Sequence, residues 1–102
     1  MKRGRYKDAL GVYREIVQGG WESAEVWNNV GVISMNLSKL KDAEAAFLRA
    51  IELRPRYASA HANLGSVCKR LGRSDEAKRH WEAALEIDPS NFEASYNLGI
   101  HQ

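Results

Sequence analysis

The sequence predicts an all-α solenoid, in which antiparallel helical hairpins stack along one axis. Three observations carry this prediction. Residues 24–57 and 58–91 align without a gap at an offset of 34 residues, which indicates an internal repeat. Apolar residues within each unit recur at helical spacing. Proline closes each unit at the same register, at Pro55 and Pro89, where it cannot continue a helix.

The two units are identical at eight of their 34 positions, whereas chance would give roughly two. The identical pairs are Ala24/Ala58, Asn29/Asn63, Gly31/Gly65, Leu37/Leu71, Ala43/Ala77, Ala50/Ala84, Glu52/Glu86 and Pro55/Pro89. The same offset leads back from Phe47 to Tyr13 and forward from Asn63 to Asn97. The chain therefore contains about three repeats, as half a repeat, two whole repeats and another half.

We assign a single domain to residues 1–102, and expect it to be a fragment of, or equivalent to part of, a longer array. Within it, 5–23 is the second helix of a truncated repeat, 24–57 and 58–91 are whole repeats, and 92–102 is the first helix of a further repeat. The apolar spacing and the turn residues predict helices near 5–18, 24–37, 41–53, 58–71, 75–87 and 92–101.

Glycine recurs at one register, at Gly31, Gly65 and Gly99. A glycine in the middle of a helix costs about 1 kcal/mol relative to alanine, so its recurrence needs a structural reason. We expect two helix backbones to approach each other closely at these positions. Small residues would face the glycines and aromatic side chains would fill the space between hairpins, namely Ala43, Ala77, Tyr13, Phe47 and Trp81.

These positions resemble the signature of the tetratricopeptide repeat family. The matching residues are Trp27, Val30, Gly31, Ala43, Phe47, Ala50 and Pro55, then Leu64, Gly65, Ala77, Trp81, Ala84 and Pro89. His61 and Ser95 depart from it at the register of Trp27, and Ser34 and Cys68 replace the usual tyrosine. The resemblance implies a right-handed superhelix whose first helices line a concave groove that binds peptides or partner helices.

Charge and composition exclude several other functions. A net charge of +2, from 15 Lys+Arg and 13 Asp+Glu, is too even for nucleic acid or an anionic membrane as the main partner. The sequence has no apolar run of the roughly 20 residues that cross a bilayer, and its single cysteine, Cys68, points to a reducing, cytoplasmic setting. We expect no enzyme and no cofactor, because phosphate-loop and nucleophile motifs are absent and His61 with Cys68 supplies only two metal ligands.

An asparagine column is the most informative functional feature. Asn29, Asn63 and Asn97 share one register, and the repeat places it toward the groove. An amide both donates and accepts, so it can pair with a peptide backbone of any sequence. The column resembles the asparagine ladder in the tetratricopeptide arm of O-linked N-acetylglucosamine transferase. The alternative is that these asparagines bond to a neighbouring helix.

Other residues are expected on the same groove, namely Asn28, Val32, Asn36, Ser66, Arg70 and Tyr96. Lys69 and Arg70 make one end basic, which suits either an acidic peptide or a solvated helix end. Chaperone-binding members of the family hold a terminal carboxylate with lysine, arginine and asparagine. Aligned by the glycines, the cation registers carry Asn28, Glu93 and Asn97, so the resemblance argues against such a clamp.

The leading hypothesis is a protein-interaction module that binds a peptide segment of a partner protein in the groove. One alternative is self-association as a weak homo-oligomer through uncapped repeat ends, where Tyr6, Leu10 and Val17 of the first helix would be partly uncovered. The other is the substrate-recruiting arm of a larger enzyme.

Overall fold

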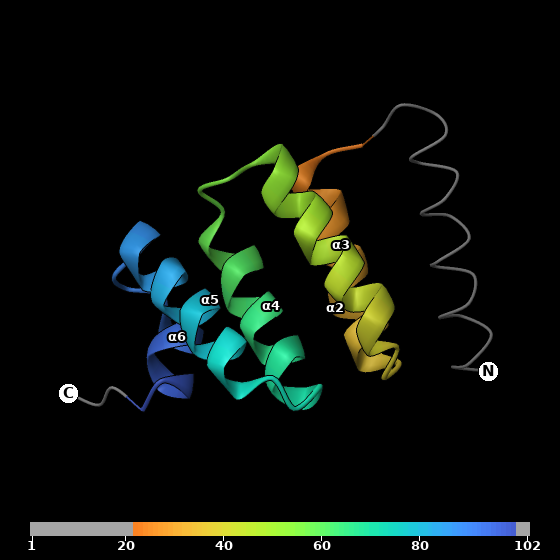
Figure 1. The fold of residues 1–102 in the computed structure, drawn as a ribbon. Coiled ribbons are helices and arrows are strands. Elements are labelled where there is room, and N and C mark those ends of the chain that lie inside the picture. The colour runs from red at the N-terminus through yellow and green to blue at the C-terminus, as the bar shows by residue number, and fades with distance from the viewer. Residues whose placement is uncertain (1–21, 100–102) are drawn as a thin grey trace.

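The computed structural model describes residues 22–99, which form helices joined by short turns and contain no strand (Figure 1). The helices are α2 (Ala24–Asn36), α3 (Leu40–Leu53), α4 (Ala58–Arg70), α5 (Ser74–Ile87) and α6 (Phe92–Asn97). The all-α prediction is confirmed, and α2 to α5 begin and end within one residue of their expected bounds. The helix expected at 5–18 lies outside the described residues. Of the helices between residues 22 and 99, none is long and apolar enough to cross a membrane.

Both complete hairpins use the same turn. Ser38 between α2 and α3 has φ 61°, and Gly72 between α4 and α5 has φ 82°. A left-handed residue at this place lets the following amide reach back to an unpaired carbonyl of the helix. The Lys39 amide donates to the Ser34 carbonyl and the Arg73 amide donates to the Cys68 carbonyl, each at 2.8 Å. Glycine adopts such a φ without strain, whereas Ser38 adopts it at a conformational cost.

Side-chain caps start two of the first helices of the repeats, α2 and α6. Ser23 accepts a hydrogen bond from the Val26 amide at 3.1 Å at the start of α2. Asn91 accepts one from the Ala94 amide at 2.9 Å at the start of α6. These contacts satisfy amides that have no partner inside the helix, and so fix where α2 and α6 begin. The helix α4 begins after Tyr57 without a side-chain cap.

The last helix is shorter than predicted, because α6 ends at Asn97 and not near residue 101. The Gly99 amide donates to the Tyr96 carbonyl at 3.0 Å, and Gly99 has φ 76°. A residue in this left-handed region ends a helix. The expectation that Gly99 lies inside a helix, as Gly31 and Gly65 do, is therefore wrong.

Gly31 and Gly65 make room for aromatic rings of the paired helix. A Cβ atom added at Gly31 would lie 2.4 Å from Cε1 of Phe47, and one at Gly65 would lie 2.4 Å from Nε1 of Trp81. Phe47 is fully buried and Trp81 is 5% exposed. We expected the glycines to be required by a close approach of two helix backbones. This explanation is wrong, because the atoms nearest to an added Cβ belong to these two rings.

The core runs through both hairpins and into α6. Phe47, Leu64, Val67 and Trp81 are its large members, and Ala94 joins α6 to the same cluster. The Trp81 indole Nε1 donates to the Ala62 carbonyl at 3.1 Å, so the polar end of this buried ring has a partner.

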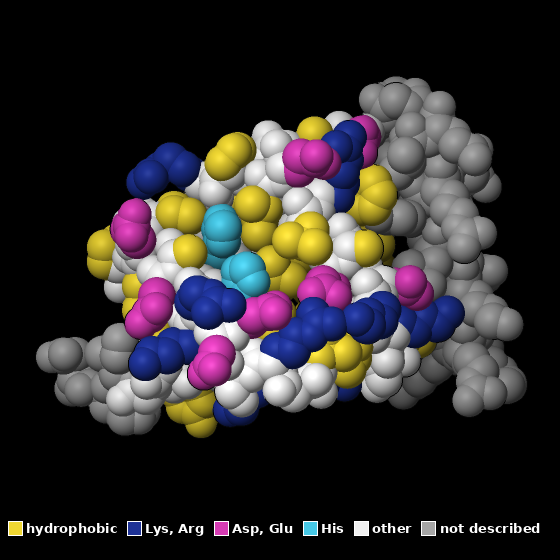
Figure 2. Space-filling model, in the orientation of Figure 1, with side chains coloured by type: hydrophobic (Ala, Val, Ile, Leu, Met, Phe, Trp, Pro, Cys, Tyr) yellow, Lys and Arg dark blue, Asp and Glu magenta, His cyan; other side chains and the backbone are white. Residues whose placement is uncertain are grey.

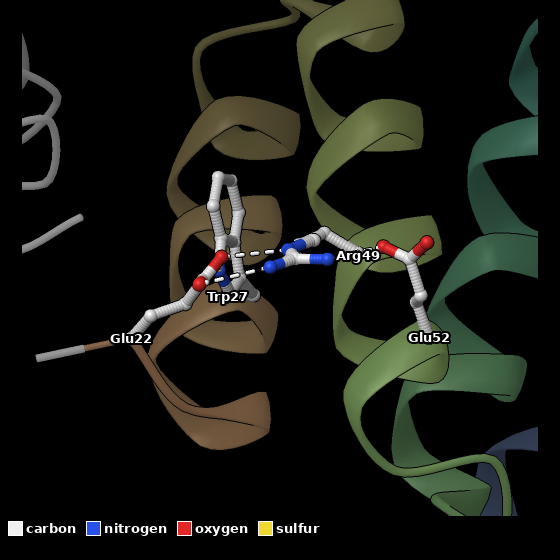
Figure 3. Close-up of polar contacts among 4 residues, drawn as sticks. All are labelled: Glu22, Trp27, Arg49 and Glu52. Atoms are coloured by element: carbon white, nitrogen blue, oxygen red, sulfur yellow. Dashed lines mark hydrogen bonds and ion pairs between the residues drawn. The ribbon is translucent and has the colours of Figure 1, made fainter. Parts of the chain in front are cut away.

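A cluster of polar side chains joins the start of α2 to α3 (Figure 3). The Glu22 carboxylate accepts hydrogen bonds from Arg49 Nε at 2.6 Å and Nη2 at 2.9 Å, and from Trp27 Nε1 at 2.7 Å. Arg49 also pairs with Glu52. The hydrogen bonds from Arg49 hold the pKa of Glu22 below its usual value. Ala83 stands at the register of Arg49 in the next repeat, so the second hairpin lacks this cluster.

Candidate functional site

The first helices of successive repeats form one face of the molecule. Cα atoms of α2 and α4 come within 8 Å of each other, and so do those of α4 and α6, whereas those of the second helices α3 and α5 do not. Since one row of helices is packed more closely than the other, the stack curves with α2, α4 and α6 on its inside. We call the surface of these three helices the inner face, and the surface on the side of α3 and α5 the outer face.

The three asparagines of the predicted column lie one on each helix of the inner face. Asn29 is exposed, and Asn63 and Asn97 are half-buried. Each of them is 34 residues from the next, which is the length of one repeat, so they are equivalent positions of successive repeats. The three asparagines therefore stand at the same register of three neighbouring helices.

One member of the column bonds to a neighbouring repeat. Nδ2 of Asn63 donates to Oδ1 of Asn28 at 3.1 Å, and Asn28 is 8% exposed. This bond joins α4 to α2, so Asn63 has in part the structural role that was the alternative to peptide binding. Ala62 stands at the register of Asn28 in the next repeat, so Asn97 has no equivalent bond.

Two further predicted residues cross-link the helices of the inner face. Ser66 donates to Glu93 Oε2 at 3.2 Å, which joins α4 to α6. Arg70 donates to the Met35 carbonyl at 3.1 Å and to Ser38 Oγ at 3.3 Å, which joins the end of α4 to the end of α2. The guanidinium group of Arg70 is thus partly used inside the fold.

The remaining predicted residues differ in how far they are exposed. Val32 is half-buried and packs against the core, and Asn36 is exposed at the last position of α2. Tyr96 on α6 is 63% exposed, and its ring stacks on that of Phe92, which is 78% exposed, with 5.9 Å between ring centres. Tyr96 therefore belongs to an exposed aromatic pair at the end of the described stack.

A second group of polar side chains lies between α4 and α5, and sequence reasoning missed it. Cys68 is buried, and Glu76 and His80 are half-buried beside it. Burial raises the pKa of the Cys68 thiol, and burial lowers the pKa of His80. Sequence reasoning paired Cys68 with His61 on its own helix. The spacing of four residues between Glu76 and His80, which places both on one side of a helix, is a sequence signal for two of the three residues, whereas Cys68 joins them only through the packing of the hairpin.

Known proteins share this fold and this repeat. A family model for the tetratricopeptide repeat matches residues 22–90. Mouse protein O-mannosyl-transferase TMTC2 is 33% identical over 63 residues, which are 59% of this chain and 8% of that protein. The chain thus spans less than a tenth of this curated relative.

Two solved structures of similar fold contain bound peptides. The first tetratricopeptide domain of Spaghetti (RPAP3), bound to the HSP90 peptide SRMEEVD, has a TM-score of 0.86 and 28% identity, over 96% of this chain and 78% of that one. The second such domain of human RPAP3, in complex with the HSP70 peptide SGPTIEEVD, has the same TM-score and identity, over 96% of this chain and 82% of that one. The family model matches more than half of this chain, and the solved structures share its fold. The chain therefore belongs to the tetratricopeptide repeat family.

Proposed function

We propose that this chain is a protein-interaction module that holds an extended peptide segment of a partner protein on its inner face. The observation that carries the proposal is the recurrence of asparagine at one register of three adjoining helices. The two peptide-bound domains of similar fold support it. Recruitment of a substrate to a larger enzyme is a special case of the same function, in which the partner is the substrate.

The column suits the backbone of a peptide better than its side chains. Packed helices lie about 10 Å apart and an extended peptide advances about 3.3 Å per residue, so adjacent asparagines would meet backbone groups about three residues apart. Each amide contact contributes only about 0.5–1.5 kcal/mol net, because water satisfies the same groups before binding. Binding is therefore expected to be weak and tolerant of peptide sequence.

The bond between Asn63 and Asn28 orients the central amide of the column. Because the NH₂ group of Asn63 donates to Asn28, its Oδ1 remains an acceptor for a backbone N–H of the peptide. Asn28 thereby acts as a positioning residue. Asn29, which is exposed, can turn either its donor or its acceptor toward the peptide.

The charges on the inner face favour an internal segment of a partner over its carboxyl terminus. Both bound peptides of the RPAP3 domains end in EEVD. In this chain Asn28, Glu93 and Asn97 occupy the registers where chaperone-binding relatives need cations. The exposed carboxylate of Glu93 would repel a terminal carboxylate at close range.

Replacing Asn29, Asn63 and Asn97 with alanine is expected to weaken peptide binding in steps, by several-fold for Asn63→Ala alone. The ligands would be extended peptides selected from a random dodecamer library with the wild-type chain, and affinity would be measured by fluorescence anisotropy. Glu82→Ala, at an exposed position of the second helix α5, is the matched control and should bind as the wild type does. Peptide affinity that is the same in the triple variant would contradict the proposal, provided that circular dichroism shows the helices intact.

The exposed aromatic pair supports self-association as a second candidate function. Phe92 and Tyr96 are 78% and 63% exposed, and an exposed apolar patch at the end of a repeat stack favours contact between copies. Sedimentation equilibrium at high micromolar concentration is expected to show a weak dimer that Phe92→Ser abolishes. Leu48→Ser, at another exposed apolar position, should leave the mass unchanged. A monomer mass at every concentration would exclude this candidate.

A further inference from the structure

Three side chains with metal-binding atoms meet between the paired helices α4 and α5. The Sγ of Cys68, a carboxylate oxygen of Glu76 and a ring nitrogen of His80 all lie within 4.8 Å of one another. Glu76 and His80 are one helical turn apart on α5, so they project from the same side of that helix. Cys68 faces them from α4, the other helix of the same hairpin. A packed hairpin thus holds the three donors together.

The donor set matches a transition metal of intermediate softness. Zn²⁺ binds thiolate, imidazole and carboxylate ligands at about 2.0–2.3 Å, and three protein ligands leave a fourth position for water. Magnesium and calcium select sites made of oxygen atoms alone, so a set that includes sulfur and nitrogen does not suit them. Among common cellular ions, zinc fits Cys68, Glu76 and His80 best.

The distances need only a small contraction to enclose an ion. Tetrahedral zinc separates its ligand atoms by about 3.5 Å. Cys68 Sγ already lies 3.8 Å from Glu76 Oε2, and the three donor atoms are no more than 4.8 Å apart. The largest separation thus exceeds the tetrahedral value by about 1.3 Å, and we expect rotation of the half-buried side chains of Glu76 and His80 to close this gap.

Solvent and ions can reach the site from the outer face. The Glu76 side chain is 45% exposed. Figure 2 shows the two histidines of the described residues next to each other on this face, with charged side chains beside them. The ring centre of His61 is 6.5 Å from that of His80. His61 Nδ1 is buried without a hydrogen-bond partner, and Nε2 lies 3.0 Å from the Pro55 carbonyl.

The neighbouring charges leave Glu76 available. Arg73 lies 3.9 Å from Glu76 but 2.5 Å from Glu44, so Glu44 is its main partner. The plainer interpretation is that Cys68 is a core residue in place of the family's tyrosine and that Glu76 serves Arg73. That interpretation gives no reason for His80 to lie within reach of the same sulfur, and it predicts no metal binding.

We propose that Cys68, Glu76 and His80 bind one Zn²⁺ ion, with the thiol of Cys68 losing its proton to solvent and a water molecule completing the coordination. The ion would link α4 to α5 on the outer face. The site is independent of the inner face, so its presence or absence does not decide the peptide-binding proposal.

The test uses the whole 102-residue chain, freed of metal with EDTA and then titrated separately with Co²⁺ and Zn²⁺. Cobalt is expected to give a thiolate-to-metal absorption band and the intense visible bands of a tetrahedral ion. Calorimetry should find one zinc ion per chain. Glu76→Gln and His80→Gln are each expected to lower zinc affinity by about tenfold or more, and Cys68→Ser should abolish the thiolate band.

Matched variants separate this site from adventitious binding. Glu82→Gln, at an exposed position of α5, and His101→Gln should bind zinc as tightly as the wild type does. His61 lies beside the three ligands, and His61→Gln should also leave the zinc affinity unchanged. Cys68 is buried, so Cys68→Ser can unfold the chain, and the fold of each variant is checked by circular dichroism. If the serine variant is unfolded, the zinc affinity of His80→Gln decides the test. The absence of a thiolate band, or zinc affinity that Glu76→Gln and His80→Gln leave unchanged, would overturn the proposal.

Discussion

Replacing Phe47 with alanine is expected to lower the free energy of unfolding by about 3–5 kcal/mol. Phe47 is fully buried in the core, and its ring fills the space above Gly31, so the change removes apolar contacts and leaves a cavity. Domains of this size are stabilised by only about 5–15 kcal/mol in total, so the variant should lose a large share of its stability. Urea denaturation followed by circular dichroism measures the effect.

The adjacent residue provides the control for Phe47. Leu48 is 50% exposed on the same helix, and Leu48→Ala should therefore cost much less than Phe47→Ala. If the two variants lost equal stability, the assignment of Phe47 to the core would be wrong.

Gly65→Ala is expected to destabilise the chain by about 1–3 kcal/mol through overpacking. Intrinsic helix propensity alone predicts the opposite sign, a gain of about 1 kcal/mol. The added Cβ would lie 2.4 Å from Nε1 of Trp81, and the indole cannot move away without straining its hydrogen bond to the Ala62 carbonyl. The sign of the change therefore distinguishes steric packing from propensity.

Two variants isolate the steric cause. Ser59→Ala, at an exposed position of the same helix, should leave stability nearly unchanged. Adding Trp81→Leu to Gly65→Ala should cost less than the sum of the two single changes, because the smaller side chain makes room for the methyl group. An unchanged or raised thermal midpoint in Gly65→Ala would show that the ring does not contact this position in solution.

Local signals were enough to predict most of the fold. The apolar spacing and the closing prolines located α2 to α5 within each hairpin, and the repeat offset showed that the second hairpin copies the first. The end of α6 was missed because Gly99 shares a register with Gly31 and Gly65 but has a left-handed φ. Gly31 and Gly65 face an aromatic ring of the second helix in their own repeat, whereas in the described chain α6 is followed by no such helix.

The candidate sites were less predictable, because they depend on side chains that meet across helices. The register of Asn63 could be read from the repeat, but its bond to Asn28 depends on how α2 and α4 pack. Cys68 and His80 are far enough apart in sequence that only the geometry of the hairpin brings them together. Equivalent positions in the other repeat carry Ser34 and Ala46, so the repeat pattern gave no warning of this group.

The central claim is that the inner face holds a peptide through its asparagine amides. Nuclear magnetic resonance tests it most directly, by following the side-chain NH₂ signals of Asn29, Asn63 and Asn97 while a library-selected dodecamer is added. The claim predicts that these signals and the backbone amides of α2, α4 and α6 shift with one common affinity, while those of α3 and the exposed side of α5 stay in place. Shifts confined to α3 and α5, or to the aromatic pair on α6, would contradict it.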